Sequence, residues 1–385
     1  MARESNPPTI GPDRIELLST IIEIDGADWR INGELTYPGR EHQGRRIEGL
    51  LLNSRMVQAV FDDENPATRR NWSYPDTGVW DPDRNTQEFC DALPLYRAHG
   101  LLGVTVGMQG GGAMYYPEVF ENYVNSAFRP DGSLKQPYLG RLAKILKAAD
   151  DQGMVVFVNY FYWKQQRFES ESAVRSAVEN MTAWLLRTGH RNILVDLKNE
   201  IQQRRDILSS RRIHELLDVA RSTTLDGRRL LVSTSIHPVK HKPNGEWHKY
   251  CDFLMPHGND SFAHEFYREL IAFKSDEDIA ANPRPICCNE DSIDIASFEA
   301  ALDAGVSWGY YDQGYGCGET QTKCDWLERE RETSFDDLSG FQTVPINWDI
   351  NTPHKRAFFT RIKEVTGSST DRAESIPTLQ ATSHR

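Results

Sequence analysis

The chain contains 385 residues, of which 39% are hydrophobic, and its formal net charge at pH 7 is −12. This hydrophobic fraction is enough for a folded core and excludes global disorder. The negative charge disfavours a nucleic-acid partner, because polyanions are bound by clustered lysines and arginines. A neutral or weakly charged substrate fits this composition better.

Several features indicate where the protein resides. No apolar run approaches the length of a membrane-spanning helix, and residues 1–8 lack the apolar core of a signal peptide. The six cysteines do not form a disulfide framework in a chain of this length, and their spacing does not resemble a zinc site. We therefore expect a cytoplasmic protein with reduced thiols and no membrane association. The sequence does not indicate the oligomeric state.

The two ends of the chain differ in composition from the rest. Residues 1–14 predict a disordered leader, and residues 367–385 predict a flexible tail. Residues 15–366 are expected to form one catalytic domain, since no linker interrupts them. Within this domain, residues 21–24 and 29–31 predict a short antiparallel hairpin that would cover the bottom of the remaining structure.

From residue 48 onward, short apolar runs alternate with helical patterns. The apolar runs predict buried parallel strands at residues 48–52, 101–106, 154–158, 193–197, 229–234, 253–255, 285–288 and 306–310. Helical patterns follow at residues 86–99, 138–152, 172–187, 209–222, 263–273, 295–304 and 354–365. The fifth unit is irregular, because residues 238–251 hold no clear helix. The sequence therefore predicts an α/β fold, a (β/α)8 TIM barrel with a short N-terminal β-hairpin and long βα loops.

Polar groups gather at the expected strand ends, where barrel enzymes carry their catalytic residues. Glu200 follows the fourth strand and Glu290 follows the seventh, so the two carboxylates can face each other across the barrel mouth. Glycoside hydrolysis needs such a pair: one acid protonates the leaving oxygen, and the other stabilises or attacks the anomeric carbon. The remaining strand-end candidates are Asn53, Arg55, Gln109, Asn159, Tyr160, Asn199, His237, His257, Asn259 and Asp312.

This arrangement resembles the clan A glycoside hydrolases, and its layout over residues 20–365 is similar to family 5 and related retaining enzymes. In that clan an Asn-Glu pair ends the fourth strand, as Asn199-Glu200 does here, and a Glu ends the seventh. The resemblance implies that Glu200 is the acid/base and Glu290 the nucleophile. It also implies that Asn199 binds the sugar 2-hydroxyl.

The resemblance extends to aromatic and imidazole groups, with two departures. His237 or His257 resembles the sugar-binding histidines, and Trp308 falls near the last-strand aromatic of the clan. However, Ile201 stands where family 5 members often have proline after the pair. The tyrosine commonly found on the sixth strand is missing, with His257 in that region.

The implied chemistry sets requirements on the two acids. Glu200 should be partly desolvated so that it stays protonated near neutral pH, whereas Glu290 should be ionised by partners such as Arg55, Tyr160 or Asn259. A retaining enzyme would place the carboxyls about 5–5.5 Å apart, and an inverting one about 6.5–9.5 Å. The expected substrate is a β-linked glycoside or short oligosaccharide, with no cofactor. Trp72 and Trp80, in a loop rich in proline and aspartate, are candidates for an exposed sugar platform.

Other interpretations remain open at this stage. Glu200 could simply cap the next helix, and the two histidines could be structural. A metal-dependent sugar isomerase or aldolase would use His237, His257, Glu200 and Glu290 as ligands, although no close pair such as His-x-His supports it. A carbohydrate-binding barrel without catalysis is the third possibility.

Overall fold

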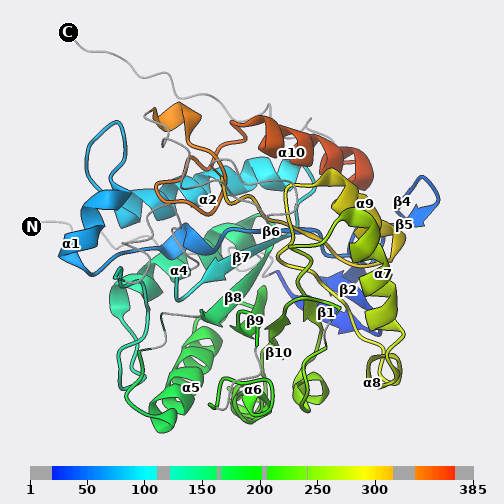
Figure 1. Cartoon of the computed structure of the whole chain (residues 1–385), viewed down its shortest axis with the longest axis horizontal. Coiled ribbons are helices and arrows are strands. Elements are labelled where there is room, and N and C mark those ends of the chain that lie inside the picture. Colours follow the sequence, from blue (N-terminus) through cyan, green and yellow to red (C-terminus); the bar gives the residue numbers. More distant parts are fainter. Residues whose placement is uncertain are drawn as a thin grey trace, which may run out of the picture.

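Parallel strands lie at the centre of the computed structural model, and helices surround them (Figure 1). The structure describes residues 20–110, 122–162, 165, 167–201, 206–240, 242–314 and 334–368. The predicted leader at residues 1–14 lies outside this range, as does all but the beginning of the predicted tail. No helix within the described residues is both long and apolar enough to cross a membrane.

Six strands form one sheet in the order β10-β9-β8-β7-β6-β13, and every neighbouring pair is parallel. They are β6 (Asn53–Arg55), β7 (Gly103–Gly107), β8 (Val155–Phe161), β9 (Ile193–Lys198), β10 (Leu231–Ser233) and β13 (Gly309–Tyr310). Strands β7, β8 and β9 are buried along their whole length, as expected of a parallel sheet covered by helices.

Shorter pairings link the two edges of this sheet. The segment after β10, β11 (Ser235–Ile236), pairs in parallel with β12 (Met255–Pro256). Parallel bridges then join Leu254 to Ile286 and Cys287 to Ser307, which lies just before β13. Within the described residues, these contacts arrange eight parallel segments in a ring, and the predicted α/β barrel is confirmed.

The long helices follow the strands and cover the ring. They are α2 (Pro82–Ala98), α4 (Gln136–Asp151), α5 (Glu171–Arg187), α6 (Ile213–Ser222), α7 (Ala263–Lys274), α9 (Ile295–Asp303) and α10 (Pro353–Thr366). Local signals explain their ends: Ser170 caps α5 by accepting from the backbone N–H of Ala173, and Gly367 ends α10 with a φ of 68°.

Short elements complete the chain. Two short helices, α1 (Pro66–Arg69) and α8 (Glu277–Ala280), and four 3₁₀ turns occur among the described residues. The 3₁₀ turns are η1 (Val57–Val60), η2 (Arg70–Trp72), η3 (Trp247–Tyr250) and η4 (Phe335–Asp337). In the fifth unit, η3 is the one helical element between β11 and β12 among the residues that the structure describes, in agreement with the missing helical pattern at residues 238–251.

An N-terminal sheet closes the bottom of the barrel. Strands β1 (Ile22–Asp25) and β2 (Asp28–Ile31) form the predicted antiparallel hairpin, and β3 (Glu34–Leu35) adds to it. The Trp29 ring is fully buried and packs edge-on against Phe253 at a centroid distance of 5.3 Å. It belongs to an apolar cluster with Val155 and Leu194, from the N-terminal ends of β8 and β9, and with Leu51, which lies just before β6. A further small hairpin consists of β4 (Glu41–His42) and β5 (Arg45–Arg46).

The position predicted for the first barrel strand was wrong. Residues 48–52 were expected to be extended, but β6 begins at Asn53. Gly49 has a φ of 82°, which interrupts an extended run at its start. The Asn53 side chain then lies inside the ring, where its amide nitrogen donates to the carbonyl oxygens of Cys288 (3.2 Å) and Trp308 (3.1 Å). Asn53 is therefore part of a strand although it is polar, and a search for apolar runs in the sequence does not detect such a position.

Candidate active site

The backbone at the end of β9 brings Glu200 to the mouth of the barrel. Glu200 has a φ of 52°, a left-handed conformation that is unusual for a residue other than glycine. Its N–H donates to the Ser235 hydroxyl oxygen at 2.9 Å, and the Lys198 ammonium group donates to its carbonyl oxygen at 2.8 Å. These contacts hold a strained turn in place, and such turns persist where the surroundings fix them.

Glu290 is held at both of its carboxylate oxygens. The Asn259 amide group donates to Oε1 at 3.0 Å, and Nε of Arg55 lies 2.9 Å from Oε2. The Arg55 side chain is 1% exposed and the Glu290 side chain 7%, so this ion pair is shielded from water. Arg55 also donates through Nη2 to Oδ1 of Asn199 at 2.7 Å, which connects the two strand ends.

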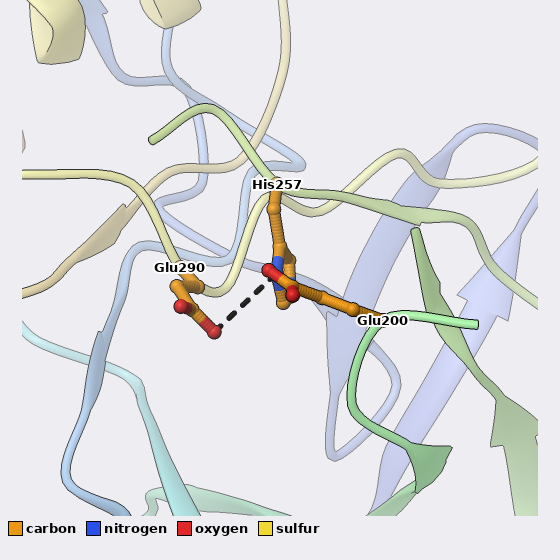
Figure 2. A group of neighbouring side chains, drawn as sticks. All are labelled: Glu200, His257 and Glu290. Atoms are coloured by element: carbon orange, nitrogen blue, oxygen red, sulfur yellow. Dashed lines mark hydrogen bonds and ion pairs between the residues drawn. The ribbon is translucent and has the colours of Figure 1, made fainter. Parts of the chain in front are cut away.

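His257 lies between the two acids (Figure 2). Its Nδ1 is 3.0 Å from Oε1 of Glu200 and 3.3 Å from Oε2 of Glu290. One oxygen from each glutamate and one nitrogen of His257 all lie within 4.8 Å of one another. The two carboxylates that the strand count placed on opposite sides of the ring therefore meet at one imidazole.

The imidazole of His257 has a partner at each ring nitrogen. Nε2 lies 3.0 Å from Oδ1 of Asn289, an acceptor whose own amide nitrogen faces the Thr105 hydroxyl at 3.4 Å. Both ring nitrogens thus face acceptor oxygens. This geometry allows His257 to share a proton with Glu200 or Glu290.

The electrostatics of Glu200 differ from the expectation. Burial raises the pKa of its carboxyl, but the hydrogen bond and charge of His257, together with the charges of His237 and Arg55, lower it to about 2. We expected desolvation to keep Glu200 protonated. In this structure the cationic groups outweigh desolvation, so the carboxylate form is favoured.

His237 adds a further cation to the same side of the mouth. Burial lowers the pKa of its imidazole, but the hydrogen bond to Asp260 and the charges of Glu200 and Glu290 raise it above its ordinary value. Its Nε2 lies 3.5 Å from Oδ2 of Asp260. His237 therefore belongs to the charged surroundings of the carboxylates, and its predicted contact with a sugar stays a prediction.

Alternation along β8 separates two predicted substrate-binding residues. Asn159 points into the barrel, where its amide nitrogen donates to Oδ2 of the fully buried Asp196 at 2.9 Å. The next residue, Tyr160, points the other way, and its hydroxyl is 3.0 Å from that of Thr182 on α5. The structure therefore does not bring Tyr160 to the carboxylates, because successive side chains of a strand face opposite sides.

The same alternation of side chains along a strand places Trp308 away from the carboxylates. Its indole N–H donates to Oδ2 of Asp291 at 2.6 Å, and its ring packs against Phe298 and Phe358 in the helical layer. Tyr311 does reach the site, and its ring centroid lies 5.5 Å from Cζ of Arg55. Trp308 is fully buried and lies outside the carboxylate cluster.

The other strand-end and platform candidates have structural partners. Oδ2 of Asp312 accepts from the Tyr310 hydroxyl at 2.8 Å, and Oδ1 accepts from the Gly314 N–H at 2.9 Å. The prediction of an exposed platform at Trp72 and Trp80 was wrong, since both rings are almost fully buried. They pack against Phe61 in a closed aromatic cluster, so neither face is open to a sugar.

Sequence reasoning missed Asn289, Tyr311 and Asp196. Asn289 immediately precedes Glu290 at the same strand end, and this position is a signal that could have identified it. Tyr311 could have been found from alternation, because Gly309 lies two residues earlier and faces inward. A Cβ on Gly309 would lie 2.5 Å from Oδ1 of Asn53 inside the ring. Asp196 carried a usable signal as well, a charged residue within an apolar run.

Comparisons with known proteins address the fold. No protein-family model and no curated protein sequence matches this chain. A GH5-4 broad-specificity endoglucanase from an uncultured bovine rumen ciliate has a TM-score of 0.51 at 10% identity, covering 82% of this chain and 95% of that one. Another solved structure, described as a glycoside hydrolase, has a TM-score of 0.50 at 10% identity, covering 90% of this chain and 73% of that one. At this identity the similarity concerns the barrel fold.

Proposed function

We propose that this protein is a retaining β-glycosidase that acts on a β-linked glycoside or short oligosaccharide. The observation that carries the proposal is the separation of the two carboxylates, whose nearest oxygens lie within 4.8 Å of each other. Retaining glycosidases place their carboxyls about 5–5.5 Å apart, whereas inverting ones need about 6.5–9.5 Å to fit a water molecule. The barrel shared with glycoside hydrolases agrees with this assignment, by analogy of fold.

Glu290 is the proposed nucleophile. A nucleophilic carboxylate must be held in a fixed orientation, and Glu290 has the Arg55 guanidinium beside Oε2 and the Asn259 amide at Oε1. In the first step, a Glu290 oxygen attacks the anomeric carbon and the bond to the leaving oxygen breaks. Asn199 is oriented by accepting from Arg55, and this leaves its amide nitrogen to donate to a sugar hydroxyl.

Glu200 is the proposed acid/base, and His257 supplies its proton. In the free protein the carboxylate form of Glu200 is favoured, because its pKa is lowered to about 2 by His257, His237 and Arg55 against the effect of burial. In the proposed mechanism the proton starts on Nδ1 of His257, 3.0 Å from Oε1 of Glu200. When a sugar excludes water from the mouth, this proton moves to Glu200 and neutralises the pair. Glu200 then passes it to the leaving oxygen, and in the second step accepts a proton from the attacking water.

Azide rescue with stereochemical analysis tests both roles. We expect Glu290→Gly to lose hydrolysis of activated aryl glycosides and to form the α-glycosyl azide, since azide enters from the vacated face. Glu200→Gly should form the β-glycosyl azide, because the glycosyl-enzyme still forms and azide replaces water in the second step. Glu34→Gly, an exposed glutamate in the N-terminal sheet, is the matched control and should keep full activity. Normal turnover by Glu290→Gly would overturn the assignment, and a panel of nitrophenyl glycosides identifies the sugar.

A metal-dependent isomerase or aldolase is the second candidate, because Glu200, His257 and Glu290 present three possible ligand atoms within 4.8 Å of one another. One contact disfavours it. Arg55 already neutralises Glu290, and a second cation beside the guanidinium would be repelled. Activity that survives exhaustive chelation excludes this candidate, and any glycoside turnover excludes a barrel without catalysis.

A further inference from the structure

The path of the backbone changes at the mouth of the barrel, where β9 ends. The regular ladder between β9 and β10 extends to the pair of Asp196 and Ser233. Beyond this pair, Glu200 takes a left-handed conformation with a φ of 52°, which departs from the extended path that a strand ladder needs. The backbone N–H groups at this turn therefore need other partners. Ser235 in the short strand β11 supplies them.

Ser235 accepts one hydrogen bond on each side of the turn. Its hydroxyl oxygen accepts from the N–H of Glu200 at 2.9 Å, and its carbonyl oxygen accepts from the N–H of Ile201 at 3.0 Å. Ser235 is fully buried, so bulk water does not compete for the hydroxyl. The two bonds thus clamp the backbone immediately before and after the Cα atom that carries the Glu200 side chain.

The Ser235 hydroxyl is itself oriented by its surroundings. The N–H of Ser235 donates to Oδ1 of Asp196 at 3.1 Å, which fixes the backbone from which the hydroxyl projects. The hydroxyl donates to the carbonyl oxygen of Lys198 at 3.2 Å, and Oδ2 of Asp196 is the next acceptor at 3.5 Å. Because a hydroxyl has one hydrogen and two lone pairs, a lone pair remains for the N–H of Glu200. Ser235 is therefore a preformed acceptor for this turn.

The same short strand also holds His257. The carbonyl oxygen of Ile236 accepts from the N–H of His257 at 2.8 Å, and β11 pairs with β12, which ends one residue before His257. Two neighbouring residues of β11 thus hold the backbones of Glu200 and His257. The contact between their side chains, 3.0 Å from Oε1 to Nδ1, depends on both of these anchors (Figure 2).

The hydroxyl bond is comparable in free energy to the strain of the turn. A left-handed residue other than glycine is strained, and this strain persists only where the surroundings hold it. One hydrogen bond contributes to folding a free energy of the same order as this strain. Without the hydroxyl, the turn can therefore relax toward commoner backbone angles while the barrel stays folded. Relaxation would move the Glu200 carboxylate, because its side chain begins at the Cα atom of the turn.

We propose that Ser235 is a positioning residue that holds Glu200 within reach of the leaving oxygen. The inference rests on the proposed glycosidase function, in which Glu200 donates the proton. Ser235 is buried and acts through the backbone of Glu200 alone. Its effect on the rate should therefore depend on how much the leaving group needs a proton, since displacement of Glu200 weakens proton transfer to that group.

Leaving groups of different basicity test this dependence. We compare kcat/KM, which reports the first step, for dinitrophenyl and phenyl β-glycosides of the sugar that the nitrophenyl panel identifies. Dinitrophenolate departs without a proton, whereas phenolate needs one. Because general acid catalysis contributes about 10²–10⁴-fold, Ser235→Ala should lose about tenfold or more with the phenyl glycoside and less than about twofold with the dinitrophenyl glycoside.

Ser233→Ala is the matched control for this experiment. It also removes a buried hydroxyl from the strand, one that donates to the Phe253 carbonyl oxygen at 2.6 Å, and this hydroxyl does not contact Glu200. We expect Ser233→Ala to change neither rate. Thermal unfolding checks the fold of each variant. Ser235→Cys keeps the volume of the side chain but offers only a weak acceptor, and it replaces Ser235→Ala if that variant does not fold.

The pKa of Glu200 provides a readout that needs no turnover. Burial raises this pKa, but the hydrogen bond and charge of His257, together with the charges of His237 and Arg55, lower it to about 2. In Ser235→Ala the contact with His257 loosens, so the pKa of Glu200 should rise toward the ordinary value of a glutamate, while Ser233→Ala should keep the wild-type value. Carboxyl ¹³C NMR of labelled glutamate measures this pKa, and Glu200→Gln assigns the signal.

The outcomes separate the positioning role from the glycosidase function. The positioning role is overturned if the folded Ser235 variant loses activity equally with both leaving groups, loses none with either, or keeps the wild-type pKa of Glu200. Absence of wild-type turnover for every glycoside in the panel, with the pKa of Glu200 raised in the Ser235 variant, would instead refute the glycosidase function and leave the positioning of Glu200 by Ser235 standing.

Discussion

Replacing Arg55 by Met removes the charge that faces Glu290 and also the bond to Asn199. The exposed fractions are 1% for the Arg55 side chain and 7% for Glu290, and their atoms are 2.9 Å apart. Removing one partner of a buried ion pair costs about 3–5 kcal/mol, because the other charge is left without compensation. We expect about 3 kcal/mol here, at the low end of that range, since Asn259 still donates to Glu290. The free energy of unfolding from urea titrations at pH 7 measures this loss.

A double-mutant cycle separates the ion pair from simple loss of packing. In Arg55→Met/Glu290→Gln neither charge remains, so the double variant should be more stable than the sum of the single losses predicts, by about 1–3 kcal/mol. Arg187→Met, at an exposed position on α5, is the control and should change stability by less than about 0.5 kcal/mol. Additive single effects, or a loss below about 1 kcal/mol for Arg55→Met, would refute the view that this pair is a strongly coupled buried contact.

Three further predictions follow from neighbouring contacts. Asn259→Ala removes the donor to Oε1 of Glu290, and we expect kcat/KM for an aryl glycoside to fall about tenfold without loss of thermal stability. Burial raises the pKa of Asp291 from 3.8 to about 7. Because an acid with a raised pKa favours folding only while protonated, stability should fall as pH rises from 4 through 7, by up to about 4 kcal/mol. Asp291→Asn should abolish this fall in urea titrations at pH 4 and pH 8, and an unchanged pH profile would contradict the shift. Trp308→Ala should destabilise the protein by about 3–5 kcal/mol, whereas Trp308→Phe should leave KM unchanged, because the ring lies in the helical layer.

Much of the fold was readable from the sequence, because most barrel elements follow simple patterns. Helix α5 was predicted at residues 172–187 and spans Glu171–Arg187, since its apolar spacing and its Ser170 cap agree. The irregular fifth unit was also predicted, because a stretch without helical periodicity does not form a long helix. The first strand was misplaced, because Asn53 looks like a strand end while its amide satisfies carbonyl groups inside the ring.

The positions of the two acids in the candidate site could be predicted from the order of the strands. Glu200 and Glu290 follow from the strand count, and the structure brings them together at His257. Tyr160 and Trp308 were selected by residue type alone, although the period of two along a strand places each on the helical side. The contact of His257 with both acids could not be read from the sequence. It depends on a two-residue strand, β12, and on the left-handed turn at Glu200.

Asn259 illustrates how the site trades stability for function. Its amide nitrogen donates to Glu290, and its Oδ1 is buried with no hydrogen-bond partner among the described residues. A buried acceptor left without a partner costs about 1–3 kcal/mol, so folding alone would favour an apolar residue or a different rotamer. The orientation is instead fixed by Glu290, whose Oε1 accepts from the same amide group at 3.0 Å. The site thus keeps the cost of an unpaired oxygen and gains a donor that holds the carboxylate of Glu290, the proposed nucleophile, in one orientation.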